Sequence, residues 1–341
     1  MKKVIVLLSG GIDSSFAAYL LKESGYYIKG LVLKMYEDFP EPTLHHNIAV
    51  LEKKLGIEIE IMDIRSAFKK DVIDYFIKTY SEGKTPNPCA RCNPEIKFRF
   101  GLKAMKEYGF DFVATGHYAD RGYYRNHLTL KQAKDRKKTQ EYFLARIRPE
   151  HLKHILFPLA NFTKEYIKKA SLKIFPEIIP RRESQDICFL KGIKVDEFLK
   201  YAGIEIHGNM IYRNKVVKEN VNILSFTRGQ RRGIEFATGH RVYVKNIDPE
   251  RKIVEIGEKE ELKTLSFTVE SPLFYVPLNE IDECFVRVRY SKSAVPCTIK
   301  KMGNKLKVQL KEPLYTVTPG QLAVFYDGDY VLGSGWIDFL L

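Results

Sequence analysis

The sequence has no long apolar segment, few cysteines and no excess of acidic residues. No apolar run approaches the ~20 residues that a bilayer-spanning helix needs, so we expect no membrane partner. Its 5 cysteines are an odd number in a chain of 341 residues, which argues against a disulfide scaffold and favours a reducing cytoplasm. The net charge is +14, which indicates either a polyanionic partner or a lysine-rich solubilising surface.

Three modules follow one another along the chain. In the first, short apolar runs such as Val4–Leu8, Ile28–Met35 and Phe110–Ala114 alternate with helical patterns, which predicts βαβ crossovers and a parallel sheet. In the last third, short strand-like segments are separated by Gly, Asn and Asp-Pro turns, which is typical of antiparallel β structure. We predict an α/β domain over 1–199, a small β-rich domain over 200–261 and an antiparallel β-barrel over 262–341.

A glycine-rich loop stands where the first strand gives way to the first helix. It reads Ser9-Gly10-Gly11-Ile12-Asp13-Ser14-Ser15. Its glycines let backbone N–H groups approach an anion, the helix N-terminus adds partial positive charge, and the serines add hydroxyl donors. Asp13 would repel a bare phosphate but can hold Mg²⁺, which bridges phosphate oxygens. The structural alternative is a plain turn with a helix cap.

The loop at Ser9–Ser15 does not match the Walker A motif. Another segment of the chain matches the last three residues of that motif but lacks its first glycine. Gly83-Lys84-Thr85 copies the end of that motif, but Lys78 stands where its first glycine is required. The phosphate-binding candidate is therefore the loop at Ser9–Ser15. Because ligands bind beyond the carboxyl ends of parallel strands, we expect it to lie beside Met35–Asp38 and Thr115–Tyr118.

Cys89 and Cys92 form a Cys-x-x-Cys pair in a proline-bounded loop that we place before a helix. The arginine between the thiols and the helix start beyond them both favour the thiolate form. A structural zinc would want a fourth ligand at close spacing, and a thioredoxin-like pair would need its own βαβ context. With Cys188, a three-thiolate iron–sulfur site stays open. Cys284 and Cys297 lie in strand-like contexts and are interpreted as buried apolar side chains.

The glycine-rich loop resembles the SGGxDS loop of the ATP pyrophosphatase superfamily, whose members attach AMP to a carbonyl oxygen. Together with further segments, the chain resembles the tRNA-specific 2-thiouridylases over nearly its whole length. The matching segments are TPNPCARCNPEIKF at 85–98, ATGHY at 114–118, QEYFL at 140–144, SQDICF at 184–189, TRGQRRG at 227–233, VRVRY at 286–290 and VTPGQLAVFYDGDYVLGSG at 317–335. Several unrelated motifs in the right order are stronger than one loop.

The resemblance implies a PP-loop (adenine nucleotide alpha hydrolase-like) fold and an ATP-dependent sulfurtransferase. The residues implied to bind ATP are Ser9, Gly10, Gly11, Asp13, Ser14, Ser15, Leu33 and Gly116, with Mg²⁺ held through ATP at Asp13. AMP is expected to pass to the C2 oxygen of the wobble uridine in tRNA. Cys188 is expected to carry a persulfide from a cysteine desulfurase or relay protein, and its terminal sulfur attacks C2. Cys92 then resolves the linkage, which leaves a Cys92–Cys188 disulfide.

The resemblance also implies a tRNA partner that is bound through its anticodon arm, with the C-terminal barrel in contact. The residues expected to bind tRNA are Lys138, Gln140, Arg228, Gln230, Arg231 and Arg232. They belong in part to two basic runs, Arg121–Lys138 and Thr227–Gly233, which suit phosphate contacts. For the first run, a solvated hairpin face is the alternative interpretation.

Two positions depart from the family pattern. Cys89 stands where many relatives carry Asp, and Thr139 stands where they usually have Asp. The first departure creates a Cys89, Cys92 and Cys188 triple, which suits a [4Fe–4S] cluster with one open iron as another route to the same thiolation. Two other functions stay open: an adenylating amide-forming ligase of the same superfamily, and a non-enzymatic RNA-binding protein that keeps ATP as a structural ligand.

Overall fold

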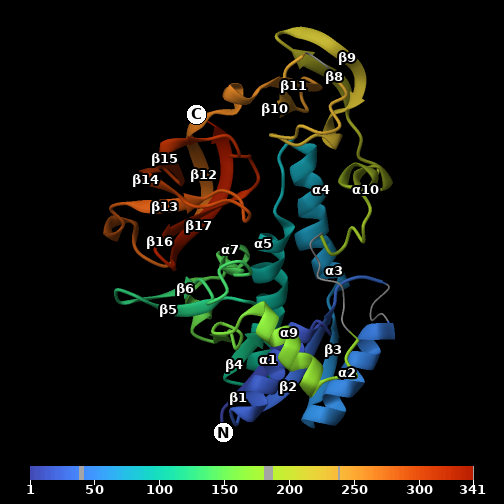
Figure 1. Cartoon of the computed structure of the whole chain (residues 1–341), viewed down its shortest axis with the longest axis vertical. Coiled ribbons are helices and arrows are strands. Elements are labelled where there is room, and N and C mark those ends of the chain that lie inside the picture. Colours follow the sequence, from blue (N-terminus) through green and yellow to red (C-terminus); the bar gives the residue numbers. More distant parts are fainter. Residues whose placement is uncertain (38–41, 180–186, 237–238, 341) are drawn as a thin grey trace.

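The computed structural model describes residues 1–37, 42–179, 187–236 and 239–340. It contains a parallel sheet at the N-terminus, a small sheet in the middle and a closed antiparallel barrel at the C-terminus (Figure 1). This is the fold class that the sequence predicted. In the described part of the chain, no helix combines the length and the apolar character needed to cross a membrane.

The N-terminal sheet consists of parallel strands in the order β3-β2-β1-β4-β7. Their bounds are β1 (Lys3–Leu7), β2 (Tyr27–Lys34), β3 (Glu58–Asp63), β4 (Phe112–Thr115) and β7 (Ile155–Leu156). Val4, Ile5 and Val6 of β1 are fully buried, because helices cover both faces of this sheet. The strand order reverses between β1 and β4, so a ligand is expected at the carboxyl ends of these two strands.

Helices surround this sheet and connect it to the other modules. Their bounds are α1 (Ile12–Glu23), α2 (Pro42–Leu55), α3 (Arg65–Phe68), α4 (Asp74–Ser81), α5 (Pro88–Cys92), α6 (Arg99–Glu107), α7 (Glu141–Leu144), α8 (Pro149–Leu152), α9 (Lys164–Ile174) and α10 (Val195–Tyr201), with π-helical turns η1 (Lys69–Ile73) and η2 (Asn93–Phe98). In Figure 1, α4 extends from the sheet toward the middle module. Its Phe76 and Tyr80 share a hydrophobic core with that module.

The Cys-x-x-Cys pair lies on a helix, so its expected position in a loop is wrong. Helix α5 begins at Pro88 and continues through η2 into α6. Asn87 is the N-cap residue, and its Oδ1 accepts a hydrogen bond from the Ala90 backbone N–H at 3.1 Å. An Asn cap followed by proline at the first helical position is a strong helix-start signal. Both thiols therefore stand on a rigid element.

The middle module is a sheet in the order β10-β11-β8-β9. Its strands are β8 (His207–Tyr212), β9 (Lys215–Asn222), β10 (Val242–Asp248) and β11 (Ile253–Glu258), with short 3-10 turns η3 (Ile223–Ser225) and η4 (Lys259–Leu262). The pairing of β8 with β11 is parallel, whereas the sequence suggested antiparallel pairing throughout. The reason is that the long connection after β9 returns the chain along the far side of β8.

The C-terminal barrel closes because its first strand, β12, pairs with its last, β17. Its strands are β12 (Thr264–Phe274), β13 (Cys284–Arg287), β14 (Val295–Met302), β15 (Lys305–Leu314), β16 (Leu322–Asp327) and β17 (Tyr330–Leu340), with the 3-10 turn η5 (Leu278–Glu280). A hairpin of β5 (Asp120–Tyr124) and β6 (His127–Lys131) pairs with β17 through Lys131 and Tyr330. The barrel is therefore joined to the N-terminal domain by strand pairing.

Candidate functional site

The loop after β1 is held in shape by its own hydroxyl groups. Ser14 Oγ and Ser15 Oγ each donate a hydrogen bond to the Gly11 carbonyl oxygen at 3.0 Å. Ser14 Oγ also accepts from the Ser9 backbone N–H at 3.2 Å. Ser14 and Ser15 are buried, so their hydroxyls fix the loop at the positive end of α1.

Two glycines allow neighbouring segments to touch this loop. Gly10 has φ 75°, and a Cβ there would overlap the Cδ1 atom of Leu44 in α2. A Cβ at Gly116, just after β4, would lie 2.6 Å from the Ser14 backbone nitrogen and 2.8 Å from the Asp13 carbonyl carbon. Glycine therefore lets the loop after β4 lie directly on the first turn of α1, as the topology predicted. Asp38, at the end of the third expected segment, lies outside the described residues.

A chain of polar contacts connects the loop to two segments far away in the sequence. Asp13 Oδ1 accepts a hydrogen bond from the Tyr118 hydroxyl at 2.8 Å, and Asp13 Oδ2 lies 2.5 Å from Lys164 Nζ. The Gln140 side-chain oxygen accepts from the Tyr118 backbone N–H at 2.9 Å. Gln140, expected at the tRNA surface, therefore supports the nucleotide loop through Tyr118. Sequence reasoning missed Lys164, although Thr163 before it is a recognisable helix cap.

Leu33 and His117 add an apolar and an uncharged side chain to this edge. Leu33 is buried near the carboxyl end of β2, in register with Met62. His117 follows Gly116, and its Nδ1 lies 2.9 Å from Thr115 Oγ1. Burial and the nearby ammonium of Lys97 lower the pKa of His117 well below its ordinary value, so this imidazole is neutral at pH 7. An apolar strand end and a neutral ring suit contact with a base or ribose.

Three thiols converge beside this edge. Cys89 and Cys92 stand on α5, and Cys188 lies in a turn after the segment that the structure does not describe, which includes Ser184, Gln185 and Asp186. Phe189 fixes that turn by packing edge-on against Phe68 and Phe76, at 6.0 Å and 5.1 Å between ring centroids. The ammonium of Lys97 favours the thiolate of all three cysteines, so these groups lie within electrostatic range of one another.

The thiols are nevertheless less acidic than the sequence suggested. Burial raises the pKa of Cys92 to about 12 and raises the pKa of Cys89 and Cys188 above the ordinary value, and Lys97 offsets only part of this effect. Arg91, which was expected to favour thiolates, turns away from them. Its Nε donates to the Asp71 carbonyl oxygen at 3.4 Å, and its guanidinium lies over the Tyr75 ring.

The other two cysteines form a buried pair in the barrel, as the sequence predicted. Cys284 and Cys297 stand opposite each other on β13 and β14. Their sulfur atoms are 3.5 Å apart, and both residues are almost fully buried. They pack the barrel interior and take no part in the site.

Thiol labelling of the native protein tests this description. Cys89 and Cys188 have solvent-exposed surface although the surrounding protein desolvates their thiols, whereas the other three cysteines are buried. We expect iodoacetamide to label Cys89 and Cys188 first, as located by peptide mass spectrometry. Because the pKa of each of these thiols is raised, their labelling rates should still increase with pH above 9, where ordinary thiols approach a plateau. A plateau below pH 8 would show that the thiolates are stabilised.

Comparison with known proteins places this site in a family. Residues 2–192 match the family model described as the tRNA methyl transferase HUP domain, and residues 262–337 match an aminomethyltransferase beta-barrel domain. The tRNA-specific 2-thiouridylase MnmA of Nitratiruptor is 36% identical over 98% of this chain and 99% of its own. The corresponding protein of Campylobacter lari is 39% identical, over 98% of this chain and 100% of its own. The chain belongs to the MnmA family of tRNA-specific 2-thiouridylases.

Similarity to solved structures is weaker. A U34-tRNA thiolase from Methanococcus maripaludis with its [4Fe–4S] cluster matches 56% of this chain and 62% of its own, with 18% identity and a TM-score of 0.36. A match of that size carries no argument about this member of the MnmA family.

The three thiols do not form a metal site as they are placed. Within residues 1–37, 42–179, 187–236 and 239–340, no group of three His, Cys, Asp or Glu side chains is arranged to hold a metal ion. Cys89, Cys92 and Cys188 would have to move relative to one another to bind a cluster. Asp13, the expected Mg²⁺ ligand, has a carboxylate but is paired with Lys164. It therefore fits Mg²⁺ only once that pair opens.

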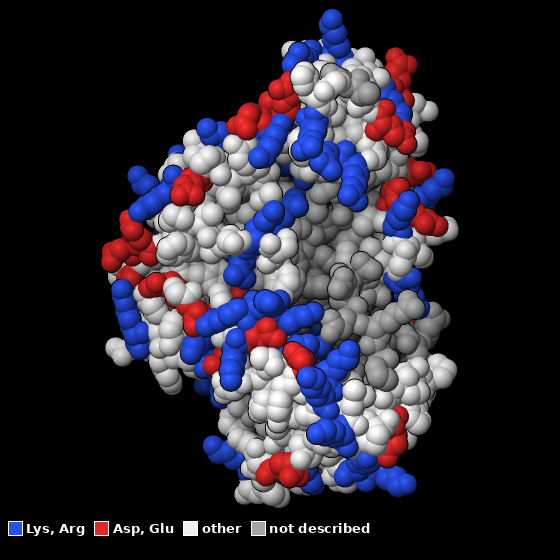
Figure 2. Space-filling model, in the orientation of Figure 1, with Lys and Arg blue, Asp and Glu red and all other residues white. Residues whose placement is uncertain are grey.

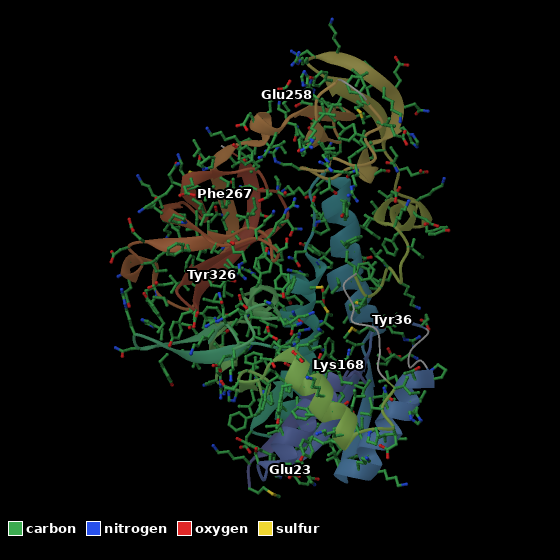
Figure 3. All side chains as sticks on the ribbon, viewed as in Figure 1. Glu23, Tyr36, Lys168, Glu258, Phe267 and Tyr326 are labelled. Atoms are coloured by element: carbon green, nitrogen blue, oxygen red, sulfur yellow. The ribbon has the colours of Figure 1, made fainter. Side chains whose placement is uncertain are left out.

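The QEYFL segment of the MnmA family is a structural junction in this chain. The Glu141 carboxylate is fully buried and accepts hydrogen bonds from Thr139 Oγ1 at 2.6 Å and from the Tyr326 hydroxyl at 3.0 Å. Arg287 of β13 donates to the same carboxylate at 3.2 Å. Thr139, a departure from the family pattern, therefore supports a polar contact between the N-terminal domain and the barrel. Figure 3 labels Tyr326 on the barrel side of this junction.

The three arginines of the first basic run bind partners within the protein. Arg121 donates to the carbonyl oxygens of Leu152 and Lys153, and Arg125 donates to that of Glu280. Arg136 pairs with Asp329. These arginines hold the β5–β6 hairpin, which favours the structural interpretation for them. Lys138 is exposed just beyond the hairpin.

The second basic run is divided between structure and surface. Arg228 donates to the carbonyl oxygens of Val317, Lys245 and Leu262, so it joins the middle module to the barrel. Gln230 accepts from the Thr227 backbone N–H at 3.0 Å and shapes the loop. Arg231 and Arg232 are exposed. Figure 2 shows Lys and Arg side chains in a band down the visible face, from the middle module to the N-terminal domain.

Proposed function

We propose that this protein is an ATP-dependent tRNA sulfurtransferase that converts the wobble uridine to 2-thiouridine. The observation that carries the proposal is the similarity to tRNA-specific 2-thiouridylases over 98% of the chain. The site supports it, because an anion-binding loop at a helix N-terminus lies near three thiols. The matching relatives are tRNA-specific 2-thiouridylases, so an amide-forming ligase is not favoured.

In the first step, the loop after β1 and Gly116 hold ATP, and Asp13 would hold Mg²⁺, which would neutralise phosphate charge. The C2 oxygen of the uridine attacks the α-phosphorus, the bond to the β-phosphate breaks, and pyrophosphate leaves. The uncharged His117 and the buried Leu33 would contact the adenosine. The protein acts here by positioning and by the positive end of α1. Adenylation turns the C2 oxygen into a good leaving group.

In the second step, Cys188 carries a persulfide that a sulfur donor supplies. The terminal sulfur attacks C2, and AMP departs with the former C2 oxygen. Cys92 Sγ then attacks the Cys188 sulfur, which releases 2-thiouridine and leaves a Cys92–Cys188 disulfide. An external thiol supplies the two electrons that reduce it. Cys188 is exposed, so a donor protein can reach it, whereas Cys92 is buried.

Cys89 distinguishes this route from transfer through a [4Fe–4S] cluster. The persulfide route needs Cys92 and Cys188 only, whereas a cluster needs three thiolate ligands. We expect Cys89→Ala, purified without oxygen, to thiolate tRNA at the rate of the parent protein and to contain no iron. Loss of both iron and activity in this variant would establish the cluster route instead.

We also propose that Arg231 and Arg232 contact tRNA phosphates. Arg231→Ala combined with Arg232→Ala should weaken tRNA binding and reduce the slope of log K against log salt by about 1.5, roughly 0.7–0.9 per lost contact. Binding isotherms at several salt concentrations measure this slope. The matched control, Lys22→Ala with Lys53→Ala, removes two exposed charges from the last turns of α1 and α2, away from the carboxyl edge of the sheet, and should leave the slope unchanged. Equal slopes in all proteins would assign Arg231 and Arg232 to structure.

The function itself is tested with unmodified tRNA. The protein is incubated with ATP, Mg²⁺, the tRNA, a cysteine desulfurase with cysteine as the persulfide donor and dithiothreitol as the reductant, and the digested nucleosides are separated by mass spectrometry. We expect 2-thiouridine only when ATP is present. Pyrophosphate release that depends on a small carboxylate would indicate a ligase, and tRNA binding without any ATP turnover would indicate a binding protein.

A further inference from the structure

Lys164 brings a positive charge to the nucleotide loop from a distant part of the chain. It is the first residue of α9, whose N-cap is Thr163, and its backbone N–H donates to Asp135 Oδ2 at 2.9 Å. Its side chain is 15% exposed and its Nζ lies 2.5 Å from Asp13 Oδ2, at the start of α1. The ammonium also lies 5.7 Å from the centre of the Tyr118 ring.

The packing of α9 makes this position rigid. Phe162 and Tyr166, on either side of Lys164, each contact Phe16 of α1 edge-on, at 6.3 Å and 6.5 Å between ring centroids. Ile167 is fully buried in the same cluster. The two helices therefore start side by side, and the Lys164 side chain is directed at the mouth of the loop rather than at solvent.

The ion pair with Asp13 also has a chemical consequence. Asp13 is a carboxylate at the place where phosphates would enter, and only a cation makes that place suitable for a polyanion. In the structure, Lys164 supplies this cation. When Mg²⁺ arrives with ATP, it competes with Lys164 for the Asp13 oxygens. The released ammonium remains within a side-chain length of the phosphates.

We propose that Lys164 is an ATP-binding residue whose ammonium moves from the Asp13 carboxylate to the β- and γ-phosphate oxygens when MgATP enters the loop. Those oxygens depart as pyrophosphate, and Lys164 stabilises the charge that develops on them. No covalent bond to the protein forms in this step. The inference rests on the proposed function only for the identity of the nucleotide.

Calorimetric titration with ATP and with AMP tests the proposal, because AMP lacks the two phosphates that Lys164 is to bind. We expect Lys164→Met to raise the dissociation constant for MgATP by about 10-fold to 100-fold, as for one lost charge-assisted hydrogen bond to a phosphate. The constant for AMP should change by less than about 3-fold. Lys164→Arg keeps the charge and should retain most of the MgATP affinity.

Lys168, one turn further along α9, provides the matched control (Figure 3). It is exposed, so Lys168→Met removes the same charge from the same helix without changing MgATP affinity. The proposal would be overturned if Lys164→Met weakened the binding of MgATP and of AMP equally, or weakened neither. The proposed function would remain supported in that case if the parent protein thiolates tRNA. If the parent protein binds no MgATP, both the proposal and the proposed function fail. Circular dichroism of each variant checks that it is folded.

Discussion

Cys188→Ser should abolish thiolation but leave pyrophosphate release intact. A serine hydroxyl cannot carry a sulfane sulfur, so formation of 2-thiouridine should fall by at least about 10³-fold. Adenylation does not use this side chain, so tRNA-dependent pyrophosphate release should remain within about 3-fold of the parent protein. Both quantities are measured in the same reaction, one by nucleoside mass spectrometry and the other by a coupled phosphate assay.

Cys92→Ser should stop the reaction one step later. Without a resolving thiol, the uridine stays attached to Cys188 through the two sulfur atoms, and the adduct is released by dithiothreitol. Cys284→Ala, which changes a buried thiol of the barrel, is the control and should retain full activity. Thiolation by Cys188→Ser at the parental rate would contradict the assignment of the sulfur carrier.

Glu141→Ala should cause the largest loss of stability. The Arg287 side chain is only 15% exposed, and the substitution leaves its guanidinium without a carboxylate partner. It also removes the acceptor of the hydrogen bond from the Tyr326 hydroxyl. Breaking a buried ion pair from one side costs about 3–5 kcal/mol in the free energy of unfolding. Urea unfolding followed by the fluorescence of Trp336, the single tryptophan, measures the effect at the barrel.

Glu150→Ala is the matched control for this loss. Glu150 forms an ion pair with Arg148 at 3.9 Å, but both side chains are more than 60% exposed. Such a pair contributes about 0–1 kcal/mol. Equal urea midpoints for Glu141→Ala and the parent protein would show that the polar junction does not hold the barrel to the N-terminal domain.

The sequence was sufficient to predict the fold class and the family. Both follow from local patterns: apolar runs that alternate with helices, and motifs that keep their order along the chain. The meeting of the loops after β1 and β4 was also predictable, since topology brings the carboxyl ends of adjacent parallel strands together. Gly116 confirms it, because a Cβ there would collide with the backbone of α1.

Features that depend on tertiary packing were not predictable. Lys164 is 151 residues away from Asp13, and no local pattern connects them. The sequence predicted that the loop of Arg228 contacts phosphates. In the structure, the Arg228 guanidinium donates hydrogen bonds to carbonyl oxygens from two modules. The neighbouring residues in the sequence predicted a lowered pKa for these thiols. In the structure, burial has the larger effect and raises the pKa of each thiol.

The fate of the uridine C2 oxygen tests the central claim most directly. The tRNA is prepared with ¹⁸O at C2 of the wobble uridine and incubated with the protein, ATP, Mg²⁺, a cysteine desulfurase with cysteine as the persulfide donor, and dithiothreitol. If AMP is attached to that oxygen before sulfur attacks, every 2-thiouridine formed should release one AMP that carries ¹⁸O on its phosphate. Recovery of the ¹⁸O in water, with unlabelled AMP, would contradict adenylation of the base.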